Sequence, residues 1–336
     1  MIPTLLAALL LSSTEERISP TIVTAPVEGD PDDPALWIDH AEPARSLVLG
    51  TDKGGRLYAF DLDGAVVATV TGLARPNNVD IETGLDLGGE AIDIAVVTER
   101  DAGRIRVFRL PELTPVDRGG IAVFRGQPDR RVMGVALYRR PDDGAIFAIL
   151  SRKDGPRDAL LWQYRLEHDG SGAVRAAEVR RFGTWHGPDH PTIPGEGNEI
   201  EAVCVDDERG DVYYAEEAIG VHRWAADPAA PDAKTERGLF ATDGFEEDRE
   251  GTSLLADPDG GGVLIVSDQA AGRFRVYARR PPHRFVTSLR LSVVESDGSD
   301  GTRRALGPRF PNGLFVAMTD EGAFHYYDAA LFPTHD

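Results

Sequence analysis

The stretch Asp211-Val-Tyr-Tyr-Ala-Glu-Glu217 decides the fold, because an apolar, β-rich run ends there abruptly on two adjacent carboxylates. Five other stretches repeat this pattern of a short apolar run that ends in polar or charged residues. They lie at 46–53, 91–100, 145–154, 262–268 and 313–320. Apolar runs of this length, bounded by polar residues and glycine, predict short buried β-strands.

Each buried strand is followed, after a glycine-containing turn, by an alternating strand with a late aromatic residue. These second runs lie at 56–60, 104–108, 161–164, 221–224, 273–277 and 324–327. A repeat of roughly 45 to 70 residues that contains only strands and turns is typical of a propeller blade. The sequence therefore predicts an all-β fold, a six-bladed β-propeller with four-stranded antiparallel blades around a central channel.

The outer strands of the repeat indicate how the ring closes. Candidate fourth strands follow the first five units, for example at 66–70 and 174–182, but none follows Tyr327 in the sixth unit. We expect Thr21-Ile-Val-Thr-Ala-Pro26 to supply the missing strand, which would cover an exposed sheet edge. Because no Ser/Gly-rich linker interrupts the repeat, residues 21–336 are expected to form a single propeller domain.

Composition restricts the partners of the chain. The 336 residues carry a formal net charge of −20, and 41% of them are hydrophobic, which is enough for a large core. A strongly acidic surface repels nucleic acid and anionic membranes, so we expect neither as a partner. The chain is expected to be a monomer that acts on a small molecule.

The N-terminal segment 1–20 contains an apolar run that is too short to cross a bilayer and lacks a basic flank. We interpret it as the end of a signal peptide, with a disordered arm as the alternative. The expected location is secreted or periplasmic. Cys204 is the single cysteine and has apolar neighbours, so it is expected to be a buried strand thiol.

Several motifs place carboxylates and cations at strand ends. Gly29-Asp-Pro-Asp-Asp-Pro-Ala-Leu-Trp37 holds three carboxylates and two prolines that make the segment rigid, and hard cations prefer several oxygens on one short loop. An Asp/Pro-rich turn is the alternative for this segment. The sequence has no glycine-rich phosphate loop, no Arg-His-Gly tripeptide and no Gly-x-Ser-x-Gly elbow.

Eight motifs follow one another along the chain: Asp32-Asp-Pro-Ala-Leu-Trp37, Thr51-Asp-Lys-Gly-Gly55, Asn77-Asn-Val-Asp-Ile81, Thr98-Glu-Arg100, Ser151-Arg-Lys-Asp-Gly155, Tyr214-Ala-Glu-Glu217, Asp248-Arg-Glu-Gly251 and Leu306-Gly-Pro-Arg-Phe-Pro-Asn-Gly-Leu-Phe-Val316. In this order they resemble the motifs of the β-propeller phytases, which are calcium-dependent alkaline phytases. The resemblance extends from about Thr24 to Phe315.

The resemblance implies a 3-phytase, a phosphoric monoester hydrolase. It would convert phytate, bound as its calcium complex, to lower inositol phosphates and phosphate by attack of a metal-activated water. Several Ca²⁺ ions would be held by Asp32, Glu201, Glu217, Asp248, Glu250 and the pair Asp297/Asp300, with Glu216 as a further candidate. Phosphate groups would be bound by Lys53, Arg100, Tyr138 and Lys153. The implied catalytic residues are Glu201, Lys153 and Asp154.

The chain departs from the family pattern in three places. Asp154 stands where the family usually has glutamate, and the aspartate-rich segment is shortened to 295–301, which leaves open whether Asp297 or Asp300 binds metal. The insertion 183–197 contains His186, Asp189 and His190. These three residues could ligate a transition metal, although a Pro/Gly-rich surface loop is the simpler interpretation.

Two other functions are consistent with a propeller of this kind. One is a sugar lactonase-type hydrolase, which needs one metal and few cations at the channel entrance. Lys53, Arg100 and Lys153 at three separate strand ends count against it. The other is a non-catalytic propeller scaffold that binds protein partners or calcium. This alternative would be favoured if the residues at the entrance could be changed without loss of hydrolysis.

Overall fold

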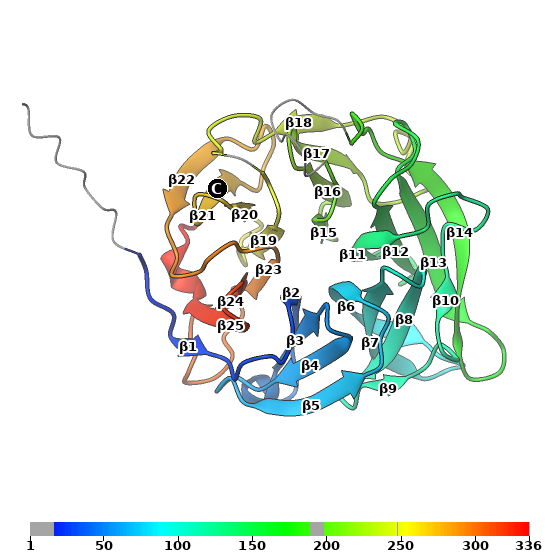
Figure 1. The fold of residues 1–336 in the computed structure, drawn as a ribbon, viewed down its shortest axis with the longest axis horizontal. Coiled ribbons are helices and arrows are strands. Elements are labelled where there is room, and N and C mark those ends of the chain that lie inside the picture. The colour runs from blue at the N-terminus through cyan, green and yellow to red at the C-terminus, as the bar shows by residue number, and fades with distance from the viewer. Residues whose placement is uncertain (1–16, 189–197, 247, 336) are drawn as a thin grey trace, which may run out of the picture.

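Six β-sheets are arranged in a ring around a central channel in the computed structural model, which describes residues 17–188, 198–246 and 248–335 (Figure 1). Five sheets have four strands, and one has a fifth short strand at its edge. Neighbouring strands within every sheet pair antiparallel. The prediction of an all-β, six-bladed propeller is therefore confirmed.

The strands follow one another from the channel to the rim of each blade. Blades 1 and 2 contain β2 (Pro31–Trp37), β3 (Leu47–Asp52), β4 (Arg56–Phe60) and β5 (Val66–Thr71), then β6 (Pro76–Asp86), β7 (Ala91–Glu99), β8 (Arg104–Leu110), β9 (Thr114–Pro115) and β10 (Ile121–Ala122). Blades 3 and 4 contain β11 (Val132–Arg139), β12 (Ile146–Arg152), β13 (Leu161–His168) and β14 (Val174–Phe182), then β15 (Val203–Asp206), β16 (Asp211–Glu216), β17 (Gly220–Ala225) and β18 (Gly238–Phe240). Blades 5 and 6 contain β19 (Thr252–Ala256), β20 (Gly262–Asp268), β21 (Arg273–Ala278) and β22 (Phe285–Leu289), then β23 (Ser299–Thr302), β24 (Leu314–Thr319), β25 (Ala323–Asp328) and β1 (Ile22–Val23).

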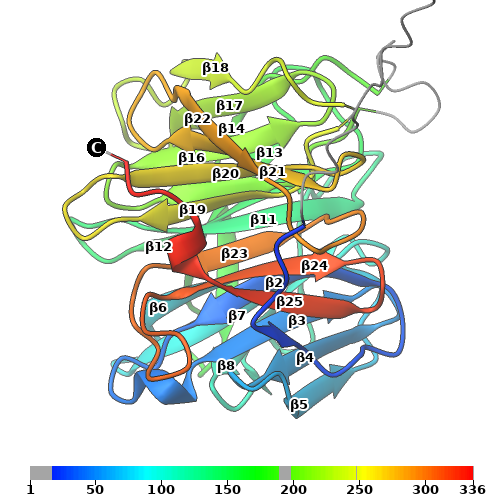
Figure 2. The same ribbon diagram turned by 90° about the vertical axis from the view of Figure 1, so that its left-hand side faces the viewer.

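The N-terminal strand closes the ring as expected. In β1, Ile22 pairs with Tyr326 and Val23 with His325, so β1 is the outermost strand of blade 6. Figure 2 shows this blade from the side, with β23, β24 and β25 facing the viewer. Upstream of β1, Ile18 pairs with Leu291 of blade 5. Most of the predicted signal-like segment, residues 1–16, lies outside the described residues.

The aspartate-rich segment contains a strand that the sequence analysis missed. Residues Ser299–Thr302 form β23, the innermost strand of blade 6. Further additions are β9, the short fifth strand of blade 2, and two single-turn 3₁₀ helices, Pro43–Arg45 and Ala329–Leu331. Within the ranges that the structure describes, no helix is long and apolar enough to cross a membrane.

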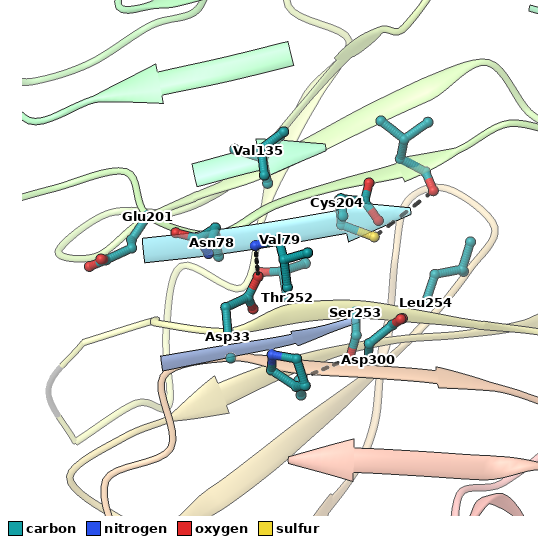
Figure 3. Close-up of a pocket in the computed structure, with 18 of the residues that line it drawn as sticks. Asp33, Asn78, Val79, Val135, Glu201, Cys204, Thr252, Ser253, Leu254 and Asp300 are labelled. Atoms are coloured by element: carbon teal, nitrogen blue, oxygen red, sulfur yellow. Dashed lines mark hydrogen bonds between the residues drawn. The ribbon is translucent and has the colours of Figure 1, made fainter. Parts of the chain in front are cut away.

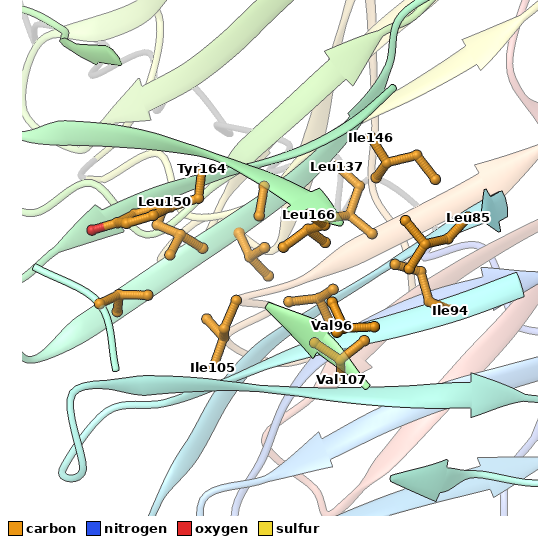
Figure 4. Packing of buried hydrophobic residues seen from close by; sticks show 14 of the residues in the cluster. Leu85, Ile94, Val96, Ile105, Val107, Leu137, Ile146, Leu150, Tyr164 and Leu166 are labelled. Atoms are coloured by element: carbon orange, nitrogen blue, oxygen red, sulfur yellow. The ribbon is translucent and has the colours of Figure 1, made fainter. Parts of the chain in front are cut away.

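Apolar side chains between neighbouring blades hold the ring together. Between blades 2 and 3, Ile94, Val96 and Val107 share a buried cluster with Leu137 and Leu150 (Figure 4). Burial of each such side chain contributes about 1.5–3 kcal/mol to the free energy of unfolding. These contacts fix the angle between adjacent blades and thereby the width of the channel.

All second strands of the blades end at the same end of the channel. The first residue of β2, Pro31, pairs with the last residue of β3, Asp52, and the same relation joins Val132 of β11 to Arg152 of β12. We call this end the mouth; it is formed by the C-terminal ends of β3, β7, β12, β16, β20 and β24. Charged residues that follow these strands are thereby brought into one place.

Candidate metal and phosphate site

A polar cavity of about 250 Å³ lies along the inner strands below the mouth. Its walls include Asp33, Asp80 and Asp300, and Glu201 lies at one end of it (Figure 3). Cys204, in β15, lines the other end (Figure 3). The thiol was expected to be buried, but it is partly exposed; desolvation still raises its pKa well above the ordinary value, which keeps it protonated.

Blade 4 places three carboxylates together at the mouth. Single ligand oxygens of Glu199, Glu201 and Glu217 all lie within 4.8 Å of one another. Backbone bonds fix two of them, because Glu199 N donates to Glu217 Oε2 at 2.8 Å and Glu217 N donates to the Glu199 carbonyl at 3.2 Å. Burial raises the pKa of Glu217 to about 9, and the charges of Glu201 and Asp248 add to the rise. An ionised cluster of this kind is stable mainly when a cation compensates it.

Blades 1 and 6 contribute a second group. Lys53 Nζ lies 3.1 Å from Asp297 Oδ2 and 3.5 Å from Asp32 Oδ1. Asp32 is 1% exposed, and neither of its oxygens accepts a hydrogen bond from any residue that the structure describes. Burial raises the pKa of Asp32 well above its ordinary value. Burial lowers the pKa of Lys53, but Asp32 and Asp297 more than offset this, and the net direction is upward.

Asp248 and Glu250 lie on the segment that leads into β19, between these two groups. Burial raises the pKa of Glu250 well above its ordinary value. The negative charges of four neighbouring acids raise it further; these are Glu217, Glu201, Asp297 and Asp248. Its Oε2 has no hydrogen-bond partner among the described residues. Gly251 allows blade 5 to approach blade 6, because a Cβ there would lie 2.4 Å from the carbonyl oxygen of Asp297.

Three cations surround the carboxylates. Lys53, Arg100 and Lys153 follow β3, β7 and β12, as the sequence analysis expected. Arg100 Nη1 donates to Asn77 Oδ1 at 3.3 Å and its Nη2 lies 4.0 Å from Glu199 Oε2, while the Lys153 ammonium contacts Glu199. Burial and the charge of Arg100 lower the pKa of Lys153.

The structure does not bring every proposed site residue to the mouth. Tyr138 is 2% exposed and packs on Phe147 near the other end of β11, about 20 Å of extended strand away from Val132.

Asp300 lies in the channel wall, where its Oδ2 accepts a hydrogen bond from Leu36 N at 2.8 Å. Glu216 points away from Glu217 because successive strand residues face opposite sides, and Asp154 is exposed beside Lys153. Of the pair Asp297/Asp300, the mouth therefore receives Asp297.

Two residues at the mouth were not singled out as site residues. Glu199 lies two residues before Glu201, a spacing that places both side chains on one face of an extended segment, so the pattern was available in the sequence. Asn77 was quoted only within the motif Asn77-Asn-Val-Asp-Ile81, without a role at the site. Its side chain links Arg100 to Glu201, since Nδ2 donates to Glu201 Oε1 and Oδ1 accepts from Arg100.

The donor set suits a hard divalent cation. The mouth offers carboxylate oxygens from several blades and no thiolate or imidazole among the described residues named above, which is the ligand chemistry that calcium prefers. Both carboxylate oxygens of Asp32 and Oε2 of Glu250 are buried and accept no hydrogen bond from the described residues, and a bound cation would satisfy them. The residues present therefore fit calcium.

The fold is a β-propeller whose mouth gathers carboxylate oxygens from several blades beside the side chains of Lys53, Arg100 and Lys153. The sequence model described as Phytase matches residues 7–325, and the chain belongs to this family of β-propeller phytases.

Among known proteins, the chain is similar to a 3-phytase of Bacillus subtilis (strain 168). The two are 28% identical over 347 residues, which cover 94% of this chain and 85% of the relative. The chain also resembles the crystal structure of BBS1N in complex with ARL6DN, soaked with lead, with a TM-score of 0.53 and 13% identity over 88% of this chain and 78% of that one. At this identity the likeness shows the fold alone.

Proposed function

We propose that the protein is a calcium-dependent phosphomonoesterase that hydrolyses phytate to lower inositol phosphates and phosphate. Membership of the phytase family supports the substrate class. The observation that carries the calcium dependence is the buried Asp32, whose oxygens lack hydrogen-bond donors among the described residues although Lys53 lies beside it. A site that contains both unsatisfied carboxylates and cations is suited to calcium and phosphate together.

The residues that would hold calcium are those that the structure gathers at the mouth. They are Asp32, Glu199, Glu201, Glu217, Asp248, Glu250 and Asp297. When bound, calcium would neutralise phosphoryl oxygens and lower the pKa of a coordinated water. Bound calcium would also reverse the local charge, which allows a chain of net charge −20 to bind a polyanion.

The three cations would bind and orient the phosphate groups. Arg100 presents a planar fork of donors to a phosphate, and Lys53 presents an ammonium. Lys153 contacts Glu199 in this structure, so a phosphate at Lys153 would replace that carboxylate as the acceptor. The lowered pKa of Lys153 also makes Nζ a suitable proton donor to the leaving inositol oxygen.

The decisive experiment measures phosphate release from phytate with calcium and with excess chelator. We expect release only with calcium. Lys153→Ala should reduce the rate about 10²-fold, because an oxyanion donor is lost, with little change in melting temperature. Lys234→Ala, at an exposed lysine in the 226–237 loop, is the matched control and should retain the parental rate.

Four results would contradict the proposal. Hydrolysis in excess chelator would remove the calcium dependence. Parental activity of Lys153→Ala would remove Lys153 from the site. A chain that binds calcium but releases no phosphate would favour the scaffold interpretation, and turnover of a sugar lactone in place of phytate would favour a lactonase.

A further inference from the structure

A second group of potential metal ligands lies on the face of blade 4 turned away from the mouth carboxylates. Nδ1 of His186 and Nε2 of His222 lie 2.9 and 3.0 Å from the same oxygen, Oε2 of Glu216. The three ligand atoms lie within 4.8 Å of one another. Glu216 and His222 are buried, whereas the side chain of His186 is 48% exposed.

We propose that His186, Glu216 and His222 bind one divalent d-block cation of the zinc type. Two imidazoles and one carboxylate are the borderline ligands that such cations select, whereas calcium requires six to eight oxygens. The site is separate from the proposed calcium site, because Glu216 and Glu217 point to opposite sides of the strand end. Asp189 and His190, the other ligands considered from sequence, lie outside the described residues.

An outer partner fixes the orientation of His222. Its Nδ1 lies 3.1 Å from Oε1 of Glu236, whose other oxygen accepts a hydrogen bond from Thr184 Oγ1 at 2.9 Å. Tyr214 stacks on the imidazole with ring centroids 4.7 Å apart and an interplanar angle of 13°. When Nδ1–H of His222 donates a hydrogen bond to Glu236, the lone pair on Nε2 is left for a cation. Metal-binding histidines commonly have such a carboxylate partner.

Glu216 is oriented in the same way. Its Oε1 accepts hydrogen bonds from the backbone N of His186, at 2.7 Å, and from the side chain of Asn198. These donors occupy Oε1 and leave Oε2 directed at the two imidazoles. Because His186 is half exposed, a cation can enter from solvent and keep a water molecule at a fourth position.

Protons compete with a cation for the two imidazoles. A histidine binds a metal ion through a neutral ring nitrogen, so zinc binding is expected to weaken as the pH falls through the ordinary imidazole range.

Occupation of the site would brace the segment beside the mouth. Asn198 donates to Glu216, accepts a hydrogen bond from Ala218 N at 3.0 Å, and immediately precedes Glu199. Trp185 Nε1 donates to the carbonyl of Asn198 at 2.7 Å. A cation held by His186 and Glu216 would thus link the first part of the insertion to the end of β16, beside the contact that Glu216 makes with Asn198.

The test is a zinc titration of the whole chain at about pH 8, above the ordinary imidazole pKa. Saturating calcium keeps zinc away from the mouth carboxylates. We expect one zinc ion per chain in equilibrium dialysis, and a zinc-dependent rise in melting temperature. His186→Gln should weaken zinc binding at least about tenfold, and Glu236→Gln should weaken it about 10- to 100-fold.

His40→Gln is the matched control, because His40 is exposed and contacts Arg304 away from the cluster. This variant should bind zinc as the parent does. The proposal is overturned if the parent binds no zinc, or if the parent and His186→Gln bind it equally. Because His186 is exposed, its replacement should leave the calcium-loaded melting curve unchanged, and loss of zinc binding can then be assigned to the lost ligand.

Discussion

The channel contains two sets of buried or partly buried acids, which differ in the groups that face them. At the mouth, Asp32 and Glu250 have oxygens without hydrogen-bond donors among the described residues. In the channel wall, each acid accepts a backbone hydrogen bond from the next blade: Asp33 from Val79 N at 3.1 Å, Asp80 from Leu137 N at 2.6 Å and Asp300 from Leu36 N at 2.8 Å. The bond between Asp33 and Val79 is visible in Figure 3.

The difference teaches that burial alone does not identify a metal ligand. Burial raises the pKa of both sets, that of Asp300 to about 6 and that of Asp297 also to about 6. Asp300 is satisfied by two peptide N–H groups, whereas Asp297 faces Lys53 and a side-chain amide. Asp32 and Asp33 are consecutive and belong to opposite sets. The wall acids join blades, and the mouth acids are available to a cation.

The largest expected effect is on catalysis. Glu201→Gln should reduce phytate hydrolysis by on the order of 10² or more, because the amide keeps the shape but removes a charge that would hold the metal. Initial rates at saturating calcium measure this. Asp80→Asn, the same change in the wall, should leave the rate close to the parental value. If both variants are equally active, the distinction between the two sets is wrong.

The second largest expected effect is a loss of stability when a chelator removes calcium. Removal of calcium present at a hundredfold excess over its Kd costs about 2.7 kcal/mol per site. The folded pKa of Glu217, about 9, exceeds its unfolded value, so the calcium-free chain should lose stability as the pH rises from about 5 towards 9. Melting curves in chelator at several pH values test this. A melting temperature independent of both calcium and pH would show that repulsion among the mouth acids does not lower the stability of the fold.

A wall acid should matter for stability and little for turnover. Asp80→Ala leaves Leu137 N without its acceptor and should lower the free energy of unfolding by about 1–3 kcal/mol. Urea unfolding measures the loss, and the folded variant should keep its phytate activity in calcium. Asp80→Asn retains an acceptor oxygen and is the control. Equal stability of the alanine variant and the parent would mean that water replaces the carboxylate.

The smallest effect concerns a pair of acids farther from the mouth. Burial and the charge of Glu82 raise the pKa of Asp207 to about 8, so stability present at acid pH is lost as the pH rises from about 4 through 8. Glu82→Gln should remove part of this loss and stabilise the chain by about 1 kcal/mol at pH 9, with little change at pH 6. Glu112→Gln, at an exposed position, is the control. If the stability difference between Glu82→Gln and the parent does not change with pH, the charge of Glu82 does not affect the titration of Asp207.

The fold was predictable because its signals are local and repeated. The same apolar run, turn and aromatic strand recur along the chain, and the missing sixth outer strand indicated ring closure by the N-terminal segment. β23 escaped detection because Ser-Asp-Gly-Thr lacks the β-branched and aromatic enrichment of strands. It becomes a strand through its pairing with β24.

The site was predictable only in part. Positions at strand ends placed Lys53, Arg100 and Lys153 correctly, because second strands of a propeller end at one mouth. Tyr138 was misplaced because it lies near the opposite end of its strand. The roles of Asp297 and Asp300 depend on which backbone or side-chain groups of blade 1 face them, and a linear pattern contains no such information.

Ring closure has a consequence for the order of folding. Phe324 N donates to Thr24 Oγ1 across 300 residues of chain, and β1 and β25 pair beside this contact. A contact between such distant residues requires closure of a very long loop, which has a high entropic cost and slows formation. During synthesis the first five blades can form from the residues already made, but the sixth is complete only when the last strand emerges. The complete ring is therefore a product of the finished chain.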